Sequence, residues 1–260
     1  MNKLLTSVIA LTALAAGPAI AADIPVKAPV APPPPAVYNW TGFYSVTTLG
    51  GGWEEINGTF ASAPTVQHNT DQSKGWWGSL YGVQYQWSNW VLGVEGGYSR
   101  PFNHDFASSL SVSADCLDGG APVANRTCAS RINNYWNVGG RLGYAWNNWL
   151  FYGTGGYANG RVQTETFVTS TPTVFTSFTS ARHGGWYAGA GVDVFVTKVW
   201  NSDLILGVEY QHVEFDTRLH VDQLPGATGI NNRNVDANLD VVRARITFKW
   251  SPGGLFGTRY

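Results

Sequence analysis

The two cysteines, Cys116 and Cys128, are the first residues whose type and spacing suggest chemistry. They lie close together in a stretch that the sequence predicts to be a long loop. In an oxidising cell envelope, a close, even pair of cysteines favours a disulfide. Closing a loop of about a dozen residues contributes about 3 kcal/mol in the chain-entropy model. A metal site is disfavoured because neither cysteine has a CxxC partner or a nearby histidine, so we predict a disulfide.

The five histidines offer a second possible site, because histidine is a common metal ligand. They are His68, His104, His183, His212 and His220. His212 lies near a strand end on the apolar face of its strand, and the other four lie in or beside predicted loops. A surface hemin site would combine one of them with aromatics such as Phe175, Phe178 or Tyr98. The absence of paired ligand spacing favours scattered polar residues instead, so we predict no cofactor and no metal.

Catalysis and nucleic-acid binding are both disfavoured. The sequence contains no GxSxG elbow and no convincing nucleophile–base pair, so we predict no catalytic residues and no enzyme. Its 16 basic and 17 acidic residues give a net charge of −1, which lacks the electrostatic footprint of a nucleic-acid-binding protein.

The composition is that of an ordered chain that is rich in aromatic residues and poor in charge. Of 260 residues, 14% are aromatic and 13% are charged, which excludes a disordered chain. Beyond residue 21 no apolar run reaches the length of about 18 residues that a membrane-spanning helix needs. Residues 1–21 have the charged, apolar and small-residue regions of a secretory signal peptide. The proline-rich residues 22–37 predict an extended spacer, and 251–260 form a C-terminal tail.

Strand signatures fill the rest of the chain. In 131–146, for example, Trp136, Val138, Leu142 and Tyr144 alternate with small or polar residues, which is typical of a half-buried strand. Eight such stretches are predicted: 40–53, 75–87, 90–100, 131–146, 149–162, 184–197, 203–216 and 239–250.

Loop length and tryptophan placement favour an outer-membrane barrel over a sandwich or a lipocalin-like barrel. Long connections (54–74, 101–130, 163–183 and 217–238) alternate with short ones, as in bacterial outer-membrane barrels. All 12 tryptophans lie near strand ends, which suits two membrane-interface belts. The belt on the short-turn side is predicted to contain Trp40, Trp87, Trp90, Trp146, Trp149, Trp200 and Trp250. The belt near the long loops is predicted to contain Trp53, Trp76, Trp77, Trp136 and Trp186.

The opposite strand faces then line a lumen that contains charged side chains. By parity these are Glu95, Arg141, Asp193, Glu209, Arg243, Arg245 and Lys249. Eight strands leave an interior that side chains just fill, and isolated buried charges are costly. Two interpretations are possible: an ion-pair network that closes the lumen, and a charged pathway for ions. We favour the ion-pair network. Inward-facing glycines leave the alternative of a narrow wet gap open.

Several segments occur in an order that is typical of one family. They are YNWTGFY at 38–44 after an ADIPVKAP spacer, VLGVEGGYS at 91–99, NVGGRLGYAW and FYGTGGYANGRV within 137–162, GWYAGAGVDVF at 185–195, LGVEYQH at 206–212 and VVRARITFKW at 241–250. Together they resemble the small alphaproteobacterial outer-membrane immunogenic proteins. The resemblance implies a porin-like eight-stranded barrel with hemin-binding relatives, and it brings no catalytic residues.

The sequence thus predicts an all-β, closed, eight-stranded, antiparallel up-and-down transmembrane barrel over 38–250, in the outer membrane of a Gram-negative cell. We expect a surface protein with a structural role in the envelope and interactions through its loops. The alternatives are a narrow porin for small solutes and a receptor for hemin or another ligand. The expected partners are outer-membrane lipid and lipopolysaccharide, the barrel-assembly machinery during insertion, and a host or phage receptor.

Overall fold

The computed structural model describes residues 38–103, 111–113, 117–118, 121–122, 126–225, 229 and 231–251. All of them belong to one compact unit, 36–260. The predicted signal peptide (1–21), the spacer (22–37) and the tail beyond Ser251 lie outside the described residues. Within the described ranges, no helix is long and apolar enough to cross a membrane.

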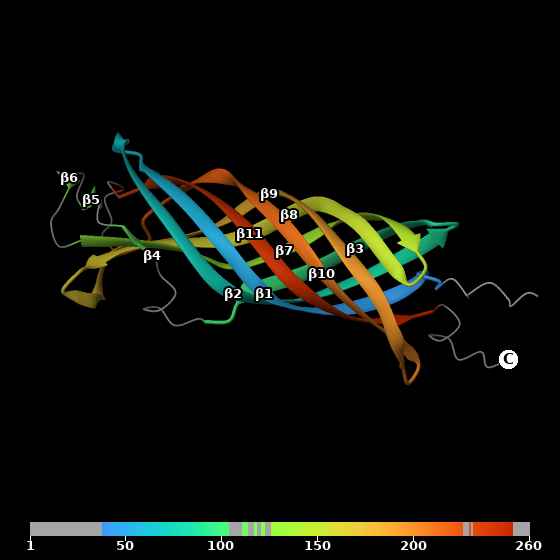
Figure 1. Ribbon diagram of the computed structural model, residues 1–260. Coiled ribbons are helices and arrows are strands. Elements are labelled where there is room, and N and C mark those ends of the chain that lie inside the picture. Colours follow the sequence, from blue (N-terminus) through green and yellow to red (C-terminus); the bar gives the residue numbers. More distant parts are fainter. Residues whose placement is uncertain are drawn as a thin grey trace, which may run out of the picture. The chain divides into compact units, whose positions relative to one another are not determined.

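Eight long strands account for most of the described chain (Figure 1). They are β1 (Gly42–Phe60), β2 (Ala63–Trp87), β3 (Trp90–Pro101), β7 (Arg126–Trp146), β8 (Trp149–Val168), β9 (Thr171–Val199), β10 (Ser202–His220) and β11 (Arg233–Trp250). Three short strands lie between β3 and β7: β4 (Ser111–Ser113), β5 (Leu117–Asp118) and β6 (Ala121–Pro122).

The long strands pair in a ring. Each pairs antiparallel with the next along the chain, β3 pairs with β7, and β1 pairs with β11. Phe43 is the register partner of Trp250, so the first and last strands are neighbours along their whole length. β4 adds three residues to the edge of β7, while β5 and β6 form a separate small sheet. Each of the eight long strands therefore has a pairing partner on both sides. A strand that crosses a membrane needs this arrangement, because hydrocarbon offers no hydrogen-bond partner to an open edge.

The two ends of the ring differ. At one end the strands are joined by two-residue turns at 88–89, 147–148 and 200–201, which we call the short-turn end. The first residue of each turn has a positive φ: Ser88 and Asn147 at 55° and Trp200 at 53°. At the opposite, hairpin end, β1 joins β2 and β8 joins β9 through 61–62 and 169–170.

The hairpin end corrects two predicted loops. Segments 54–74 and 163–183 are not loops, because β1, β2, β8 and β9 run through them except at their tips. Their outward positions are polar, for example Glu55 and Asn57, while inward positions mix apolar and polar types. The apolar–polar alternation that marks a strand was therefore hidden. Of the other predicted loops, β7 begins within 101–130 and β10 and β11 extend into 217–238.

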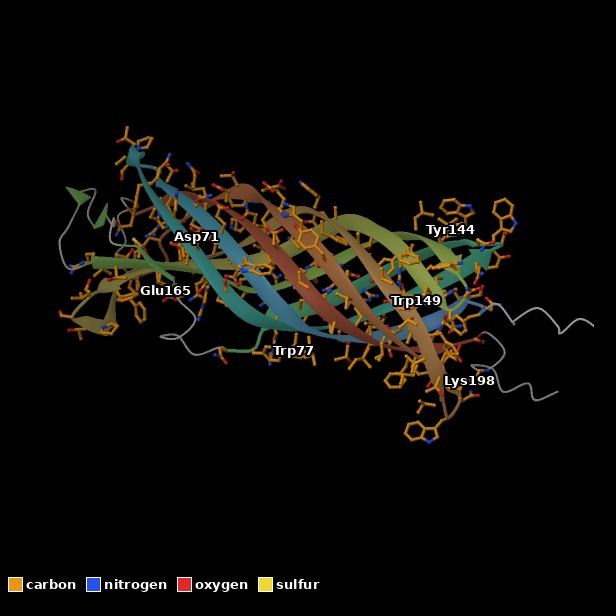
Figure 2. The ribbon with its side chains drawn as sticks, in the orientation of Figure 1. Asp71, Trp77, Tyr144, Trp149, Glu165 and Lys198 are labelled. Atoms are coloured by element: carbon orange, nitrogen blue, oxygen red, sulfur yellow. The ribbon has the colours of Figure 1, made fainter. Side chains whose placement is uncertain are left out.

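The outward faces of the strands form an apolar band with polar ends. On β1, Phe43, Leu49 and Trp53 are exposed, and the next outward residues are polar. On β2 the apolar outward residues end at Trp77, beyond which Asp71 is exposed. Figure 2 shows Trp77 on one side of this band, Tyr144 and Trp149 at the short-turn end, and Asp71 towards the hairpin end. Exposed apolar and buried charged residues invert the arrangement of a water-soluble protein.

Most predicted belt tryptophans lie on this outward face. Trp77 and Trp250 are half-buried, and eight others are exposed: Trp53, Trp87, Trp90, Trp136, Trp146, Trp149, Trp186 and Trp200. The predictions for Trp40 and Trp76 are wrong, because both side chains are buried inside the ring. Trp40 precedes β1 and folds into the short-turn mouth. Trp76 precedes Trp77 in the same strand, and adjacent strand residues point to opposite faces.

Candidate functional site

The interior of the ring is the candidate functional site, and β11 shows how it is layered. Going from the short-turn end to the hairpin end, its buried inward residues are Lys249, Thr247, Arg245, Arg243, Val241, Leu239, Ala237, Val235 and Arg233. Basic residues at the mouth and in the middle are thus followed by four apolar residues and then by another arginine. From the short-turn end we name four layers by their β11 residues. They are the mouth plug (Lys249), the charged layer (Arg245 and Arg243), the apolar layer (Val241 to Val235) and the outer polar layer (Arg233).

The mouth plug is built from the residues just before β1. Trp40 is fully buried and packs in a cluster with Val91, Leu150 and Ile205, and with Tyr38 at its edge. Its backbone N–H donates to Gln86 Oε1 at 2.7 Å, and its carbonyl accepts from Gln84 Nε2 at 2.7 Å. These backbone hydrogen bonds fix the Trp40 indole across the mouth. The packing of this ring against its apolar neighbours contributes stability, because an aromatic side chain buries a large apolar area.

Two further contacts fasten the plug. Tyr38 stacks on Phe195 with ring centroids 4.3 Å apart and donates its hydroxyl to Asp203 Oδ2 at 2.7 Å. Lys249 Nζ lies 3.2 Å from the Asp203 carboxylate and donates to the Asn39 carbonyl at 2.7 Å. Lys249 therefore faces inward as predicted, but it serves the mouth plug. Asp203, its partner, was missed because it lies at a strand start beside a turn.

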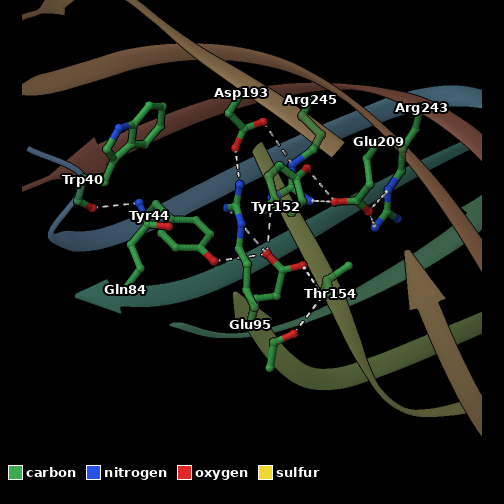
Figure 3. Close-up of polar contacts among 12 residues, drawn as sticks. Trp40, Tyr44, Gln84, Glu95, Tyr152, Thr154, Asp193, Glu209, Arg243 and Arg245 are labelled. Atoms are coloured by element: carbon green, nitrogen blue, oxygen red, sulfur yellow. Dashed lines mark hydrogen bonds and ion pairs between the residues drawn. The ribbon is translucent and has the colours of Figure 1, made fainter. Parts of the chain in front are cut away.

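The charged layer joins the remaining predicted lumen residues (Figure 3). Arg245 occupies its centre: one guanidinium nitrogen contacts Glu209 Oε2, another donates to Glu95 Oε2 at 3.2 Å, and Nε lies 3.8 Å from Asp193 Oδ1. Arg243 Nε donates to Glu209 Oε1 at 3.0 Å. Arg141 pairs with Asp193 and lies 4.0 Å from Glu95. All six side chains are at most 3% exposed: Glu95, Arg141, Asp193, Glu209, Arg243 and Arg245.

Tyrosines complete the charged layer. The Tyr44 hydroxyl donates to Glu95 Oε2 at 3.0 Å, and that of Tyr152 donates to Glu209 Oε2 at 2.8 Å. The Arg141 guanidinium lies over the Tyr152 ring, 3.6 Å from its centroid. Three carboxylates thus face three guanidinium groups, and tyrosine hydroxyls donate to two of the carboxylates, Glu95 and Glu209. Such compensation is what buried charges need to remain ionised.

The apolar layer lies between the charged layer and the hairpin end. One buried ion pair lies at the same level: Lys74 Nζ is 3.1 Å from Glu54 Oε2, and Glu54 is the register partner of Leu239. The layer is one buried cluster drawn from seven of the long strands: Ile56, Trp76, Ile132, Tyr135, Ala158, Val162, Tyr187, Val213, Phe215, Val235, Ala237, Leu239 and Val241. Trp76 packs against Tyr135 with ring centroids 5.6 Å apart. This packing explains why an indole expected in the membrane belt is inside.

The outer polar layer contains histidines that the sequence analysis placed in loops. His68, His183 and His220 are each at most 1% exposed. His183 Nδ1 lies 2.9 Å from the Asp216 carbonyl, which can only accept, so this nitrogen must donate. In a neutral ring Nε2 is then an acceptor, and His220 Nε2, at 2.8 Å, donates to it. His220 Nδ1 in turn accepts from Thr164 and Thr179 at 2.8 and 2.9 Å.

Burial sets the charge states in this layer. Desolvation, followed by the nearby Arg233, lowers the pKa of His68 to about 3. Desolvation, with neighbouring His183 and Arg233, lowers the pKa of His220 to about 3. Desolvation raises the pKa of Glu165 to about 7 against the opposing effects of Gln163 and Arg131. The histidines are therefore neutral at pH 7, as their hydrogen-bond pattern requires.

The structure does not assemble the suggested ligand sites. His104 lies outside the described residues, and among those described no group of three or more His, Cys, Asp or Glu could hold a metal ion. Tyr98 is opposite Trp136 at the apolar band, whereas Phe175 is opposite Phe167 near a hairpin tip. Cys128 is buried beside Arg233 and Thr166. Its predicted partner Cys116 lies outside the described residues, so the disulfide stays a prediction.

Comparison with known proteins agrees with this architecture. Residues 7–242 match the family model described as an outer membrane protein beta-barrel domain. The chain belongs to this family. It is 27% identical over 255 residues to the 31 kDa outer-membrane immunogenic protein of Brucella melitensis, covering 92% of this chain and 97% of that protein. It is 30% identical over 196 residues to the 22 kDa outer membrane protein of Rhizobium leguminosarum bv. viciae, covering 74% of this chain and 70% of that protein.

Solved structures of outer-membrane proteins also match. OprG from Pseudomonas aeruginosa does so with a TM-score of 0.42 and 13% identity, over 80% of this chain and 96% of that one. The family match and the named relatives place this protein in the outer membrane of a Gram-negative cell. The predicted family resemblance and location are thus confirmed, and the apolar band is the surface that meets lipid.

Proposed function

We propose that this family member is a sealed surface barrel, which displays its hairpin end outside the cell and does not pass solutes. One observation supports this above all others: the charged layer lies between two packed, buried layers, the mouth plug and the cluster around Val213, Phe215 and Leu239, and the second layer also encloses the Glu54–Lys74 ion pair. Apolar constrictions exclude water from a pore. A hydrated ion would therefore have to lose its water twice along one path.

The inward glycines also favour a sealed lumen over the narrow wet gap. A Cβ at Gly82 would lie 2.3 Å from Tyr44 Cζ, and one at Gly191 would lie 2.4 Å from the Tyr152 hydroxyl. A Cβ at Gly139 would lie 2.5 Å from the Tyr187 hydroxyl. Tyrosine rings thus take the space that the glycines leave, which supports a filled interior over the porin alternative.

The outward display is the second half of the proposal. The Brucella melitensis relative is named as an outer-membrane immunogenic protein and the Rhizobium relative as an outer membrane protein, and neither name is that of an enzyme. Together with the lack of a nucleophile–base pair in the sequence, this supports a non-catalytic role. Beyond the apolar band β1 stays paired with β2 and β11, and β8 with β7 and β9, so a host or phage receptor would meet a stiff surface. The barrel-assembly machinery is the expected partner during insertion.

Planar-bilayer recording tests the seal. We expect the pure wild-type protein to produce no steady single-channel steps. Trp40→Ala thins the mouth plug and Phe215→Ala with Leu239→Ala thins the apolar layer, and each change alone should leave the barrel silent because the other layer remains. The triple variant should conduct. Heat-modifiable gel migration confirms that each variant is folded, and steady steps from the wild type would support the narrow porin instead.

A further inference from the structure

The polar rim just beyond the apolar band, at the hairpin end, is divided by charge. On β10, β11, β1 and β2 the outward charged residues in this rim are the acidic Glu214, Asp216, Asp236, Asp240, Glu55 and Asp71, with one basic residue, Arg218, at the β9 side of β10. On β8 and β9 the charged outward residues at the same level are Arg161 and Arg182. One flank of the barrel therefore repels anions and the other attracts them.

Arg161 and Arg182 are direct register partners on neighbouring strands, and both are exposed. Two like charges in this position destabilise a sheet. Within the described residues neither arginine forms an ion pair, and Arg182 makes one long contact, 3.4 Å from Nη1 to Asn159 Oδ1. Two guanidinium groups with most of their donors unmatched thus point outward from one spot on the wall.

This spot has a defined height relative to the membrane. Tyr157 and Trp186 are register partners on the same two strands, and both are exposed at the edge of the apolar band. Arg161 follows Tyr157 by four residues, or about 13 Å along the strand and about 10 Å along the membrane normal at the usual tilt. The polar headgroup layer is about 5–8 Å thick. Because arginine stems bend along apolar surfaces, their heads reach the phosphate level.

We propose that Arg161 and Arg182 bind the phosphorylated headgroup of an outer-leaflet glycolipid of the lipopolysaccharide class. Guanidinium groups match phosphate oxygens with two parallel hydrogen bonds each. A phosphate between the two arginines relieves their mutual repulsion. Asn159, beside them on β8, adds an amide that can contact the sugar, while Tyr157 and Trp186 contact the first part of the acyl chains. The acidic flank disfavours the same headgroup, so the lipid binds on one side.

Native mass spectrometry of the mature protein in detergent, titrated with bisphosphorylated lipid A, tests this site. We expect Arg161→Gln with Arg182→Gln to weaken binding of the first lipid by about tenfold or more. Lys198→Glu is the matched control. It lowers the net charge by the same two units at an exposed position near the short-turn end, away from the pair, and should leave binding unchanged. Gel migration checks that both variants fold.

Three further arms identify the ligand. Dephosphorylated lipid A should bind the wild type as weakly as lipid A binds the arginine variant. Inorganic phosphate should compete poorly, because the acyl chains contribute to binding, and full competition by phosphate would show a free-anion site instead. Equal loss of binding in the arginine variant and in Lys198→Glu would show that net charge alone causes the effect, and would overturn the proposal. Salt-sensitive dimers that disappear in the arginine variant would also overturn it, since they would show that a second copy's acidic flank occupies the pair. This test does not depend on whether the lumen conducts.

Discussion

At the residue scale, the charged layer depends on carboxylates that each serve more than one guanidinium group. Glu209 accepts from Arg243 and contacts Arg245, and its removal leaves both without their shared partner. Breaking a buried pair by removing one partner costs about 3–5 kcal/mol, because the remaining charge is uncompensated.

Glu209→Leu should therefore destabilise the barrel by about 3–5 kcal/mol. Urea unfolding of the protein in lipid vesicles, followed by tryptophan emission, measures the change. Glu214→Leu is the control, since Glu214 is exposed on the same strand and should change stability little. An unaltered midpoint for Glu209→Leu would argue against ion pairing as the stabilising feature of the lumen.

Trp200 presents a different residue-scale case. It has a φ of 53° at the tip of a two-residue turn and is 98% exposed. A left-handed conformation costs an ordinary side chain about 1 kcal/mol, and an exposed indole gains nothing from packing in this chain. Its preference for the membrane interface supplies the compensating gain.

Trp200→Gly should consequently have opposite effects in two environments. In detergent we expect the variant to be more stable by about 1 kcal/mol, because glycine adopts this φ without strain. In bilayers we expect the gain to shrink or reverse, since the anchor is lost. Asn147→Gly, which relieves a similar φ without removing an aromatic ring, separates the two effects. A stability gain that is equal in both environments would contradict an anchoring role.

At the element scale, the parts of β2, β9 and β10 beyond the apolar band carry buried neutral histidines, and the His183–His220 hydrogen bond joins two of these strands. The folded-state pKa of His68 and of His220 is about 3, below the ordinary value of 6.5. The unfolded chain therefore binds more protons between these values, so stability is lost as the pH falls below about 6.5. Glu165, with a folded pKa of about 7, acts in the opposite sense between about 7 and 4.5. The loss should thus steepen below about pH 4.5.

Hydrogen exchange of the outer parts of β9 and β10 between pH 7 and 4 measures this effect, after correction for the intrinsic exchange rate. His220→Gln should flatten the response, since glutamine does not titrate. His212→Gln is the control. Burial lowers the pKa of His212, but hydrogen bonds to Asp240 and Glu214 outweigh this and raise it, and the ring lies outside the buried layer. An identical acid response in wild type and His220→Gln would exclude this cause.

The same elements show what the sequence could predict. The strands of the apolar band were predicted correctly because lipid on one side enforces strict alternation, as in Trp136 to Tyr144. Beyond the band, both faces of β1 and β9 are partly polar, and the pattern that separates strand from loop disappears. His183 and His220 were placed in loops for this reason. The contact between His183 and His220 forms only because β9 and β10 both continue as strands to this point. The spacing of residues along the sequence does not indicate that contact.

At the scale of the whole molecule, the charged layer connects strands that are not neighbours. Glu95 on β3 contacts Arg245 on β11, and Arg141 on β7 contacts Asp193 on β9. The parity of these positions was visible in the sequence, but the order of the layers along the lumen was not. The order of the layers follows from the inward residues of β11, which occupy successive heights along the lumen in the folded ring.

The Lys249 ammonium has a consequence for how the protein is made. It donates to the carbonyls of Asn39 and Thr41, 210 and 208 residues earlier in the chain. Contacts between such distant segments form late, because the intervening chain must first be ordered. Lys249 on β11 thus holds the residues that precede β1, the strand with which β11 pairs. One side chain therefore couples closure of the β1–β11 seam to the seating of the Trp40 indole at the short-turn end, so the two events are expected to occur together.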